Sequence, residues 1–308
     1  MEIWDTVIVG AGPAGLAAGI YAGRSKLSTL ILDQMMPGGQ LLITELIENY
    51  PGFSEGITGF ELSEKLRVHA EKFGAKFENS QPVVDVALDG DIFVVKTDSK
   101  EIRGKTVIWA AGSVARKLNV PGEAEFVGRG VSYCAVCDGA FFKDKVVAVV
   151  GGGDSALEEA LYLTKFAKKV YLIHRRDAFR AVKIIQERVK NCEKIEPLLN
   201  RVVESINGTQ FVESLTLKNV KTGELEDLPV DGVFIFIGNE PNSAPVRFLV
   251  DTDERGFIIT DENMATKTKG LFAAGDVRKK PLKQVVTAVS DGAIAAMSAT
   301  KYLEEREG

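Results

Sequence analysis

The chain has 308 residues, of which 45% are hydrophobic, with 38 Lys and Arg against 43 Asp and Glu and a formal net charge of −5. This balance gives no general attraction for nucleic acid or for anionic lipid, and the length allows two domains of roughly 100–200 residues. The apolar runs are shorter and more often broken by glycine than the ~20 residues that a membrane span needs.

A β-α-β unit is predicted at the start of the chain. The expected elements of this region are a strand at 6–9, a helix at 14–22, a strand at 28–32, a loop at 37–40, a helix at 59–73 and short β-type runs from 83 to 111. The first strand follows Met1 too closely to leave space for a secretion signal, so we expect a cytoplasmic protein.

A second β-α-β unit is predicted from Val146 onward. Around it the sequence indicates connections at 113–123 and 239–242, a strand ending at Gly238, a strand at 271–274 and a last helix at 283–303. We therefore expect an α/β fold with two Rossmann-like domains. One is discontinuous, at 1–114 and 243–308, and the other is inserted at 115–242.

Two glycine fingerprints follow two of these strands, and each opens a helix-like segment. This arrangement places a pyrophosphate on a helix N-terminus, and the small residues allow a tight turn and a close approach of the backbone to phosphate. The first comprises Gly10, Gly12, Pro13, Ala14 and Gly15, and the second comprises Gly151, Gly153, Asp154, Ser155 and Ala156. The pair predicts two bound dinucleotides.

The residues that end the next strand differ between the two units. Asp33 is an acceptor suited to ribose hydroxyls and would repel a 2′-phosphate, so the first site should hold FAD or NAD. The second site is followed by a cationic cluster, formed by His174, Arg175, Arg176 and Arg180. Guanidinium groups suit a phosphate dianion, which predicts NADPH. The alternatives are a solvated arginine face paired with Glu158 or Glu159, and an Asp33 that merely ends a strand.

A single Cys-x-x-Cys, Cys134 to Cys137, precedes the second fingerprint. In a reducing compartment this spacing is catalytic or metal-binding more often than structural. One pair supplies only two of the four ligands of a structural zinc, so we predict no metal site and favour a small disulfide ring. Asp138 is a candidate general acid/base, with a turn residue as the alternative. Cys192 is interpreted as an ordinary thiol.

These motifs together resemble the low-molecular-weight bacterial thioredoxin reductases over essentially the whole chain. The motifs are GAGPAG, GGQL, ENYPGF, CAVCDG, GGGDSA, HRRDAFRA and GDV, in this order. The resemblance implies a homodimeric flavoenzyme that reduces oxidised thioredoxin with NADPH. It also implies that Cys137 faces the flavin, that Cys134 attacks the partner disulfide and that Asp138 donates the proton.

The resemblance adds further residues to the FAD site. They are Asp33, Gln34, Gly38, Gly39, Gln40, Asn49, Gly275, Asp276, Val277, Lys283, Gln284 and Val285. Two departures from the family pattern are the run Leu41–Thr44, where threonines are frequent, and Lys283, where arginine is usual. A lysine keeps the charge but loses the guanidinium fork.

Both the cysteine pair and the predicted NADPH site lie in the inserted domain, although both must meet the same flavin. We therefore expect this domain to rotate about linkers near Ser113 and Asn239. The alternatives are a related flavoenzyme that uses ferredoxin, oxygen or another thioredoxin-like partner, and a redox-inert FAD-binding module whose cysteines hold a metal. The arginine cluster and the second fingerprint favour a pyridine nucleotide over ferredoxin.

Overall fold

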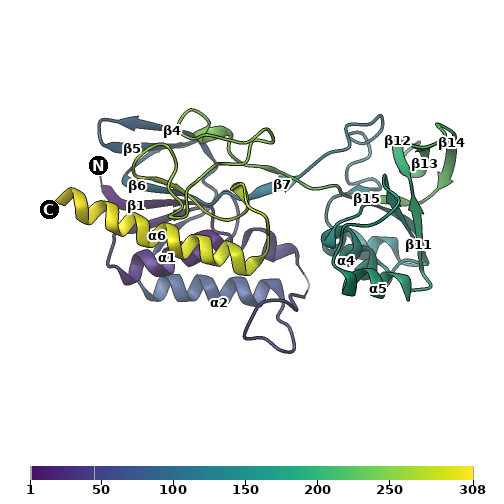
Figure 1. The fold of residues 1–308 in the computed structure, drawn as a ribbon, viewed down its shortest axis with the longest axis horizontal. Coiled ribbons are helices and arrows are strands. Elements are labelled where there is room, and N and C mark those ends of the chain that lie inside the picture. Colours follow the sequence, from purple (N-terminus) through teal and green to yellow (C-terminus); the bar gives the residue numbers. More distant parts are fainter. Residues whose placement is uncertain (1, 45, 308) are drawn as a thin grey trace. The chain divides into compact units, whose positions relative to one another are not determined.

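The structure is a computed structural model, and it describes residues 2–44 and 46–307. The chain divides into two units, Met1–Val114 with Glu240–Gly308 and Ala115–Asn239 (Figure 1). The second unit is thus inserted into the chain of the first. Each unit contains a sheet with several parallel strands, packed with helices, so the predicted α/β class is confirmed.

The first unit is built on a seven-stranded sheet of order β3-β2-β1-β6-β5-β4, with β17 paired to β6. Strands β1, β2, β3, β6 and β17 run parallel, whereas β4, β5 and β6 form an antiparallel meander. The strands are β1 (Ile3–Val9), β2 (Thr29–Leu32), β3 (Lys76–Glu78), β4 (Val83–Asp89), β5 (Ile92–Thr97), β6 (Glu101–Trp109) and β17 (Leu271–Ala273). Because β1, β2 and β6 are parallel, their carboxyl ends form one edge, where a ligand is expected to bind.

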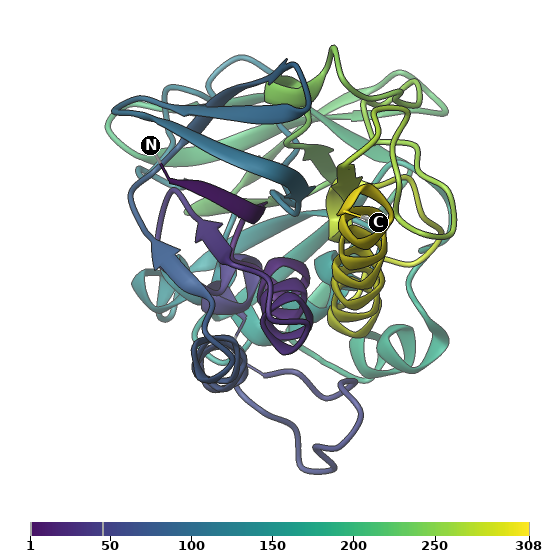
Figure 2. The ribbon, with the colours of Figure 1, turned by 90° about the vertical axis from the view of Figure 1, so that its left-hand side faces the viewer.

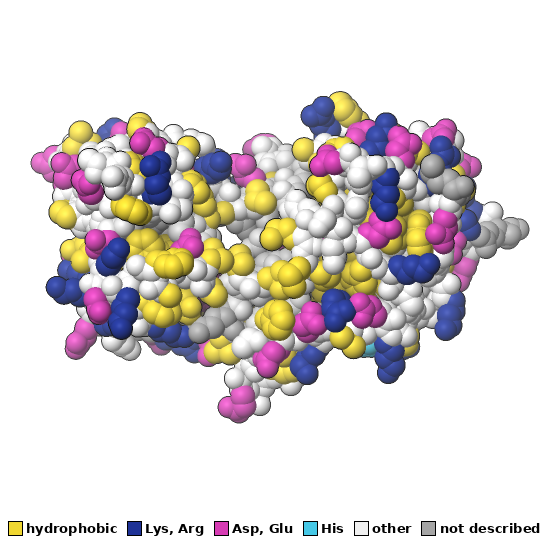
Figure 3. Space-filling model, turned by 180° about the vertical axis from the view of Figure 1, so that it is seen from behind, with side chains coloured by type: hydrophobic (Ala, Val, Ile, Leu, Met, Phe, Trp, Pro, Cys, Tyr) yellow, Lys and Arg dark blue, Asp and Glu magenta, His cyan; other side chains and the backbone are white. Residues whose placement is uncertain are grey.

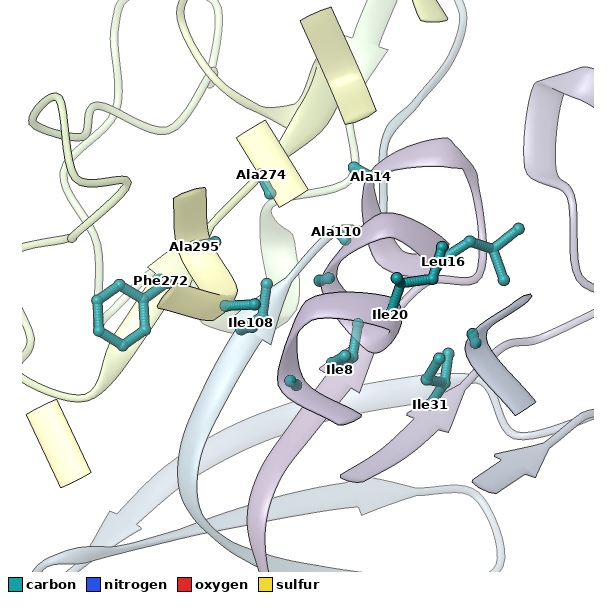
Figure 4. Close-up of a cluster of buried hydrophobic side chains, with 14 of the residues drawn as sticks. Ile8, Ala14, Leu16, Ile20, Ile31, Ile108, Ala110, Phe272, Ala274 and Ala295 are labelled. Carbon is teal, nitrogen blue, oxygen red and sulfur yellow. The ribbon is translucent and has the colours of Figure 1, made fainter. Parts of the chain in front are cut away.

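Three helices lie beside this sheet: α1 (Pro13–Arg24), α2 (Gly59–Lys72) and α6 (Val285–Glu307). Helices α1 and α6 run side by side (Figure 2), and a Cβ on Gly292 would lie 2.0 Å from the Ala14 carbonyl oxygen. Glycine at position 292 therefore permits this close helix crossing. The core between helices and strands contains Leu16 and Ile20 of α1 together with Ile8, Ile31 and Ile108 of the strands (Figure 4).

The second unit has a five-stranded parallel sheet of order β11-β10-β9-β15-β8 and an antiparallel sheet β12-β13-β14. The strands are β8 (Val131–Ser132), β9 (Val146–Gly151), β10 (Lys169–His174), β11 (Ile195–Leu199), β12 (Arg201–Gly208), β13 (Val212–Asn219), β14 (Leu225–Pro229) and β15 (Gly232–Phe236). The helices are α3 (Ala135–Asp138), α4 (Asp154–Leu163) and α5 (Lys183–Lys190). The central strand β9 is almost entirely buried, which agrees with its continuous apolar run.

Several predicted loops contain regular structure. The segments that were expected to be plain connections include β7 (Ser113–Ala115) and β16 (Asn239–Pro241), and these two strands pair with each other. Part of the predicted loop at 37–40 belongs to the 3₁₀ helix η1 (Gly39–Ile43). Three shorter 3₁₀ turns are η2 (Gly139–Phe142), η3 (Ala244–Val246) and η4 (Gly275–Val277).

The last helix begins two residues later than predicted. The Gln284 carbonyl accepts from Ala288 N–H, so Gln284 is the N-cap and Lys283 lies outside the helix. The Thr287 hydroxyl accepts from Gln284 N–H. The sequence pattern could not separate this cap from the helix, because Lys283 and Gln284 are both good helix formers.

The surface carries a mixture of both charges. Figure 3 shows basic and acidic side chains interspersed on the visible face of each unit, as expected for a net charge of −5. Within the described residues, no helix is both long and apolar enough to cross a bilayer.

Candidate functional site: two glycine loops and a disulfide

The first glycine loop joins β1 to α1, and the chain itself explains two of its three glycines. Gly10 has a φ of +104°, and a Cβ there would lie 2.4 Å from the Ala110 carbonyl oxygen. A Cβ on Gly15 would lie 1.8 Å from the Gly10 carbonyl oxygen. Gly12 differs, because its φ is −74° and its Cβ would meet no atom within 4 Å. The fold of the chain itself therefore does not require glycine at position 12. The space that a side chain would occupy there, beside the N-terminus of α1, is open.

The second loop, between β9 and α4, repeats this arrangement. A Cβ on Gly151 would lie 2.4 Å from the Phe236 carbonyl oxygen and 2.5 Å from the Ala156 Cβ. Gly153 has a φ of −98° and open space around its missing Cβ. In both loops the middle glycine thus provides room for a group outside the chain.

The N-termini of α1 and α4 also lack side-chain caps. Helix α2 is different, since Thr58 and Glu61 form a complete capping box at its start. The backbone N–H groups of α1 and α4 remain available to an anion, which fits the pyrophosphate of a dinucleotide.

Asp33 organises the first glycine loop. One carboxylate oxygen accepts from Ala11 N–H at 2.6 Å and the other accepts from Met35 N–H at 2.8 Å. Each carboxylate oxygen has a second lone pair, so Asp33 retains acceptor capacity for a ribose hydroxyl. The sequence predicted the ribose contact but not this local structural role.

Three other predicted FAD residues, Gly38, Gly39 and Gly275, lie against the first glycine loop and the start of α1. Gly38 N–H donates to the Ala11 carbonyl at 2.7 Å, and a Cβ on Gly39 would lie 3.1 Å from the Gly12 Cα. A Cβ on Gly275 would lie 2.8 Å from the Ala14 Cβ. The structure thereby brings residues from three distant parts of the sequence to the carboxyl edge of one sheet.

Two further contacts involve the residues just before α6. Asn49 Nδ2 donates to Gln284 Oε1 at 2.9 Å, and Lys283 Nζ donates to the Asp276 carbonyl at 3.0 Å. Lys283 Nζ also lies 3.2 Å from the centre of the Phe257 ring. Burial lowers the pKa of Lys283 to about 8. The sequence gave no indication of the Phe257 contact, which depends on a distant loop.

A buried charge network that sequence reasoning missed supports this edge. Asp291 Oδ2 accepts from Gly275 N–H at 3.0 Å and pairs with Arg278 at 2.9 Å and Lys280 at 3.1 Å. Lys280 Nζ lies 3.3 Å from Asp276 Oδ1, a buried atom without a hydrogen-bond partner of good geometry. Asp291 therefore connects the start of η4 to helix α6, and Asp276 keeps acceptor capacity.

In the second unit, His174 and the arginines have different environments. The His174 ring is buried against the glycine loop, where a Cβ on Gly152 would lie 2.3 Å from it. Burial lowers the pKa of His174, and the nearby charges of Arg180, Arg176 and Arg175 lower it further. The imidazole is therefore neutral at pH 7, and the exposed cationic group consists of the three arginines.

The loop that carries Arg180 is fixed to the second glycine loop. Arg180 N–H donates to the Gly152 carbonyl at 2.7 Å, and Asp154 Oδ1 accepts from Val182 N–H at 2.7 Å. These bonds hold the arginine loop beside the start of α4. A phosphate contact from Arg180 and a pyrophosphate contact at Gly153 are thus compatible with one extended ligand.

Cys134 and Cys137 form a disulfide at the start of α3. Cys134 is the N-cap of this helix, and its Sγ accepts from Cys137 N–H at 3.1 Å. Asp138, the last residue of α3, accepts from the Ser132 hydroxyl at 2.6 Å. Cys137 is exposed and Cys134 is half-buried, so the pair is accessible to a reductant.

The third cysteine, Cys192, is unbonded and half-buried, and it packs against the hydrophobic core of the second unit. Among the residues that the structure describes, no three His, Cys, Asp or Glu side chains form a cluster able to hold a metal ion. Cys134 and Cys137 can carry out thiol–disulfide exchange, and the nearby Asp138 carboxyl group can serve as a proton donor or acceptor for it.

Comparisons of the sequence and of the structure with known proteins lead to the same family. Residues 4–292 match the family model described as pyridine nucleotide-disulphide oxidoreductase. The chain is 51% identical to a protein of Bacillus subtilis named thioredoxin reductase, over 99% of this chain and 96% of that protein. A crystal structure of Lactococcus lactis thioredoxin reductase matches with a TM-score of 0.96 at 47% identity, over 98% of this chain and 99% of that one.

A crystal structure of T. acidophilum thioredoxin reductase matches with a TM-score of 0.93 at 35% identity, over 99% of this chain and 100% of that one. A ferredoxin-flavin thioredoxin reductase from Clostridium acetobutylicum is more distant, with a TM-score of 0.55 at 34% identity over 99% of both chains. The Lactococcus lactis and T. acidophilum structures are therefore both more similar to this chain than this ferredoxin-flavin enzyme is.

Proposed function

This chain belongs to the thioredoxin reductases of the pyridine nucleotide-disulphide oxidoreductase family, and we propose that it passes electrons from NADPH to a thioredoxin through Cys134 and Cys137. The enzyme is an NADPH-dependent flavoprotein disulfide oxidoreductase. The observation that carries the proposal is the accessible disulfide, beside a carboxyl group, in a chain with two matching dinucleotide loops.

The first unit is proposed to bind FAD and the inserted unit NADPH. The open space at Gly12, the uncapped start of α1 and the acceptors Asp33 and Asp276 suit FAD. The open space at Gly153 and the arginine cluster suit NADPH. When bound, FAD supplies two-electron transfer between a nicotinamide and a disulfide.

Residues of the chain itself are proposed to bind the phosphate groups and to carry out the thiol–disulfide exchange. The backbone at Gly12 and Gly153 holds the two pyrophosphates. Arg175, Arg176 and Arg180 bind the 2′-phosphate of NADPH. Cys134 attacks the disulfide of the partner, Cys137 accepts electrons from the flavin side, and Asp138 holds the proton that a departing sulfur takes up.

The coenzyme assignment is tested by steady-state reduction of thioredoxin with NADPH and with NADH. NADPH should be the better donor, and Arg175→Ala and Arg176→Ala should each raise the KM for NADPH roughly tenfold, as expected for loss of one charged hydrogen bond. The KM for NADH should not change. Arg247→Ala, at an exposed arginine of the first unit, is the control. Equal use of both coenzymes by the unmodified protein and by both variants would overturn the assignment.

We also propose that the protein is a cytoplasmic homodimer, on the basis of the family resemblance. Light scattering at several protein concentrations tests the dimer. The ferredoxin alternative predicts reduction of the disulfide by reduced ferredoxin but not by NADPH, and the same assay with both donors distinguishes them. The arginine cluster favours NADPH, since ferredoxin would leave it without a ligand.

A further inference from the structure

Ser132 lies at the centre of a small hydrogen-bond network beside the disulfide. It is the last residue of β8, it is only 4% exposed, and β8 pairs with β15 in the parallel sheet. The position of its side chain is therefore fixed by the core of the second unit. Neither the motifs nor the family resemblance singled out this residue.

The Ser132 hydroxyl reaches three groups. It accepts from Cys134 N–H at 3.0 Å, and it lies within donating distance of Asp138 Oδ2 at 2.6 Å and of the Cys134 carbonyl at 3.1 Å. A serine hydroxyl has one hydrogen and two acceptor lone pairs. It can consequently donate to only one of these two oxygens at a time.

This choice of acceptor matches the two protonation states of a carboxyl group. When Asp138 is ionised it only accepts, and the Ser132 hydroxyl donates to it. When Asp138 is protonated it donates to Ser132 Oγ, and the Ser132 hydrogen turns to the Cys134 carbonyl. In both states every group in the network keeps a partner, so neither state leaves an unsatisfied polar atom in a half-buried site.

We propose that Ser132 is a positioning residue that allows Asp138 to give up and regain a proton during thiol–disulfide exchange at Cys134 and Cys137. The inference rests on the proposed function only for the role of Asp138. Its physical basis is the network itself, in which one hydroxyl joins the carboxyl group to the main chain of Cys134.

With a dithiol reductant, the exchange takes place in two displacement steps. One thiolate of the reductant attacks a sulfur of the Cys134–Cys137 bond, this bond breaks, and a mixed disulfide forms. The departing sulfur takes the proton that Asp138 held. The second thiolate of the reductant then displaces the remaining protein sulfur, which is protonated from solvent, and Asp138 regains its proton from solvent.

The test measures the rate at which dithiothreitol reduces the disulfide of the full-length protein between pH 6 and 9, with thiols counted after alkylation. Ser132→Ala should slow reduction on the order of tenfold at neutral pH, the effect of losing one hydrogen bond to a charged group. Ser205→Ala removes a half-buried hydroxyl of the same unit and is the control. The pair Ser132→Thr and Ser132→Val, equal in size, isolates the hydroxyl if the alanine variant does not fold.

The decisive comparison is made in an Asp138→Asn background. If Ser132 acts through Asp138, Ser132→Ala adds no further loss there. An unchanged rate in Ser132→Ala, an equal loss in both backgrounds, or equal rates in the threonine and valine variants would each overturn the proposal. The assay needs neither NADPH nor thioredoxin, so a failure of the proposed function would be seen separately.

Discussion

At the scale of single residues, the two middle glycines are the most informative positions. Gly12 and Gly153 have φ angles that any residue adopts and open space around the missing Cβ, so the folded chain tolerates a methyl group at either one. At Gly10 and Gly151, in contrast, an added Cβ would clash with a backbone carbonyl oxygen. The middle glycines are consequently sites where a substitution affects a ligand and not the fold.

Gly12→Ala should weaken FAD binding, and Gly153→Ala should weaken NADPH binding, each by about tenfold or more, because the methyl group occupies the place of a phosphate. The melting temperature of the FAD-free protein should stay within about 2 °C in both variants, since surface changes without lost contacts have small effects. Calorimetric titration with each dinucleotide measures the two affinities, and thermal unfolding of the FAD-free protein measures the melting temperatures. A crossed result, with FAD binding lost in Gly153→Ala, would contradict the assignment of the units.

Lys283 predicts a pH dependence of FAD binding. Its pKa is lowered to about 8 by burial, and only the ammonium form attracts a phosphate. The affinity for FAD should therefore be highest well below pH 8, and it should decline as the pH rises through 8. Lys283→Arg keeps its charge over this range and should remove the decline. Flavin fluorescence titrations at pH 7 and pH 9 measure the effect, and an affinity that is equal at both pH values would exclude a phosphate contact from Lys283.

At the scale of elements, the network around Asp291 joins the turn η4 to helix α6. Removing one partner from a buried ion pair leaves charges without compensation. Asp291→Asn should lower the free energy of unfolding by about 3 kcal/mol and should also weaken FAD binding, because Asp276 loses its support. Asp251→Asn, in the exposed pair with Lys267, should cost at most about 1 kcal/mol. Denaturant unfolding of both variants is the measurement, and similar losses would refute the network's role.

The same elements show which parts of the site a sequence can reveal. The glycine loops, Asp33 and the cysteine pair were predictable because each motif is local, with its spacing set by one strand, one turn and one helix. Asp291 and Phe257 were not. Asp291 of helix α6 contacts Arg278, and Phe257 contacts Lys283, and both contacts join segments whose approach depends on the tertiary fold. No sequence motif indicates Ser132, because serine is common at the end of a strand. Its role depends on the hydrogen bond to Asp138, which only the structure shows.

The predicted fold class and most elements were confirmed, and the differences lie in the connections and at the ends of the last helix. Strands β7 and β16 were not predicted because each has only three residues and neither is a continuous apolar run like that of β17. Their stability comes from pairing with each other, which sequence periodicity does not report. The two linkers are therefore held together as a ribbon and not as two independent strands of chain.

At the scale of the whole molecule, this ribbon is a candidate hinge. Gly112 and Gly238 precede its two strands, with φ angles of +63° and +110° and open space around each missing Cβ. Alanine at both positions should disfavour these backbone conformations by about 1–2 kcal/mol per residue. If turnover requires rotation of the inserted unit, steady-state reduction of thioredoxin should fall several-fold in the double variant. Reduction of the disulfide by dithiothreitol should not change, and an unaffected turnover would argue against a hinge at the ribbon.

The path of the electrons is the central claim, and one stoichiometric experiment tests it most directly. The FAD-loaded protein is mixed anaerobically with NADPH and oxidised thioredoxin, and thiols formed on thioredoxin are counted against NADPH consumed. We expect two thiols for each NADPH, with none above background in Cys134→Ser or in Cys137→Ser. Thioredoxin reduction that persists in either variant, or NADPH consumption without thiols in the unmodified protein, would contradict the account.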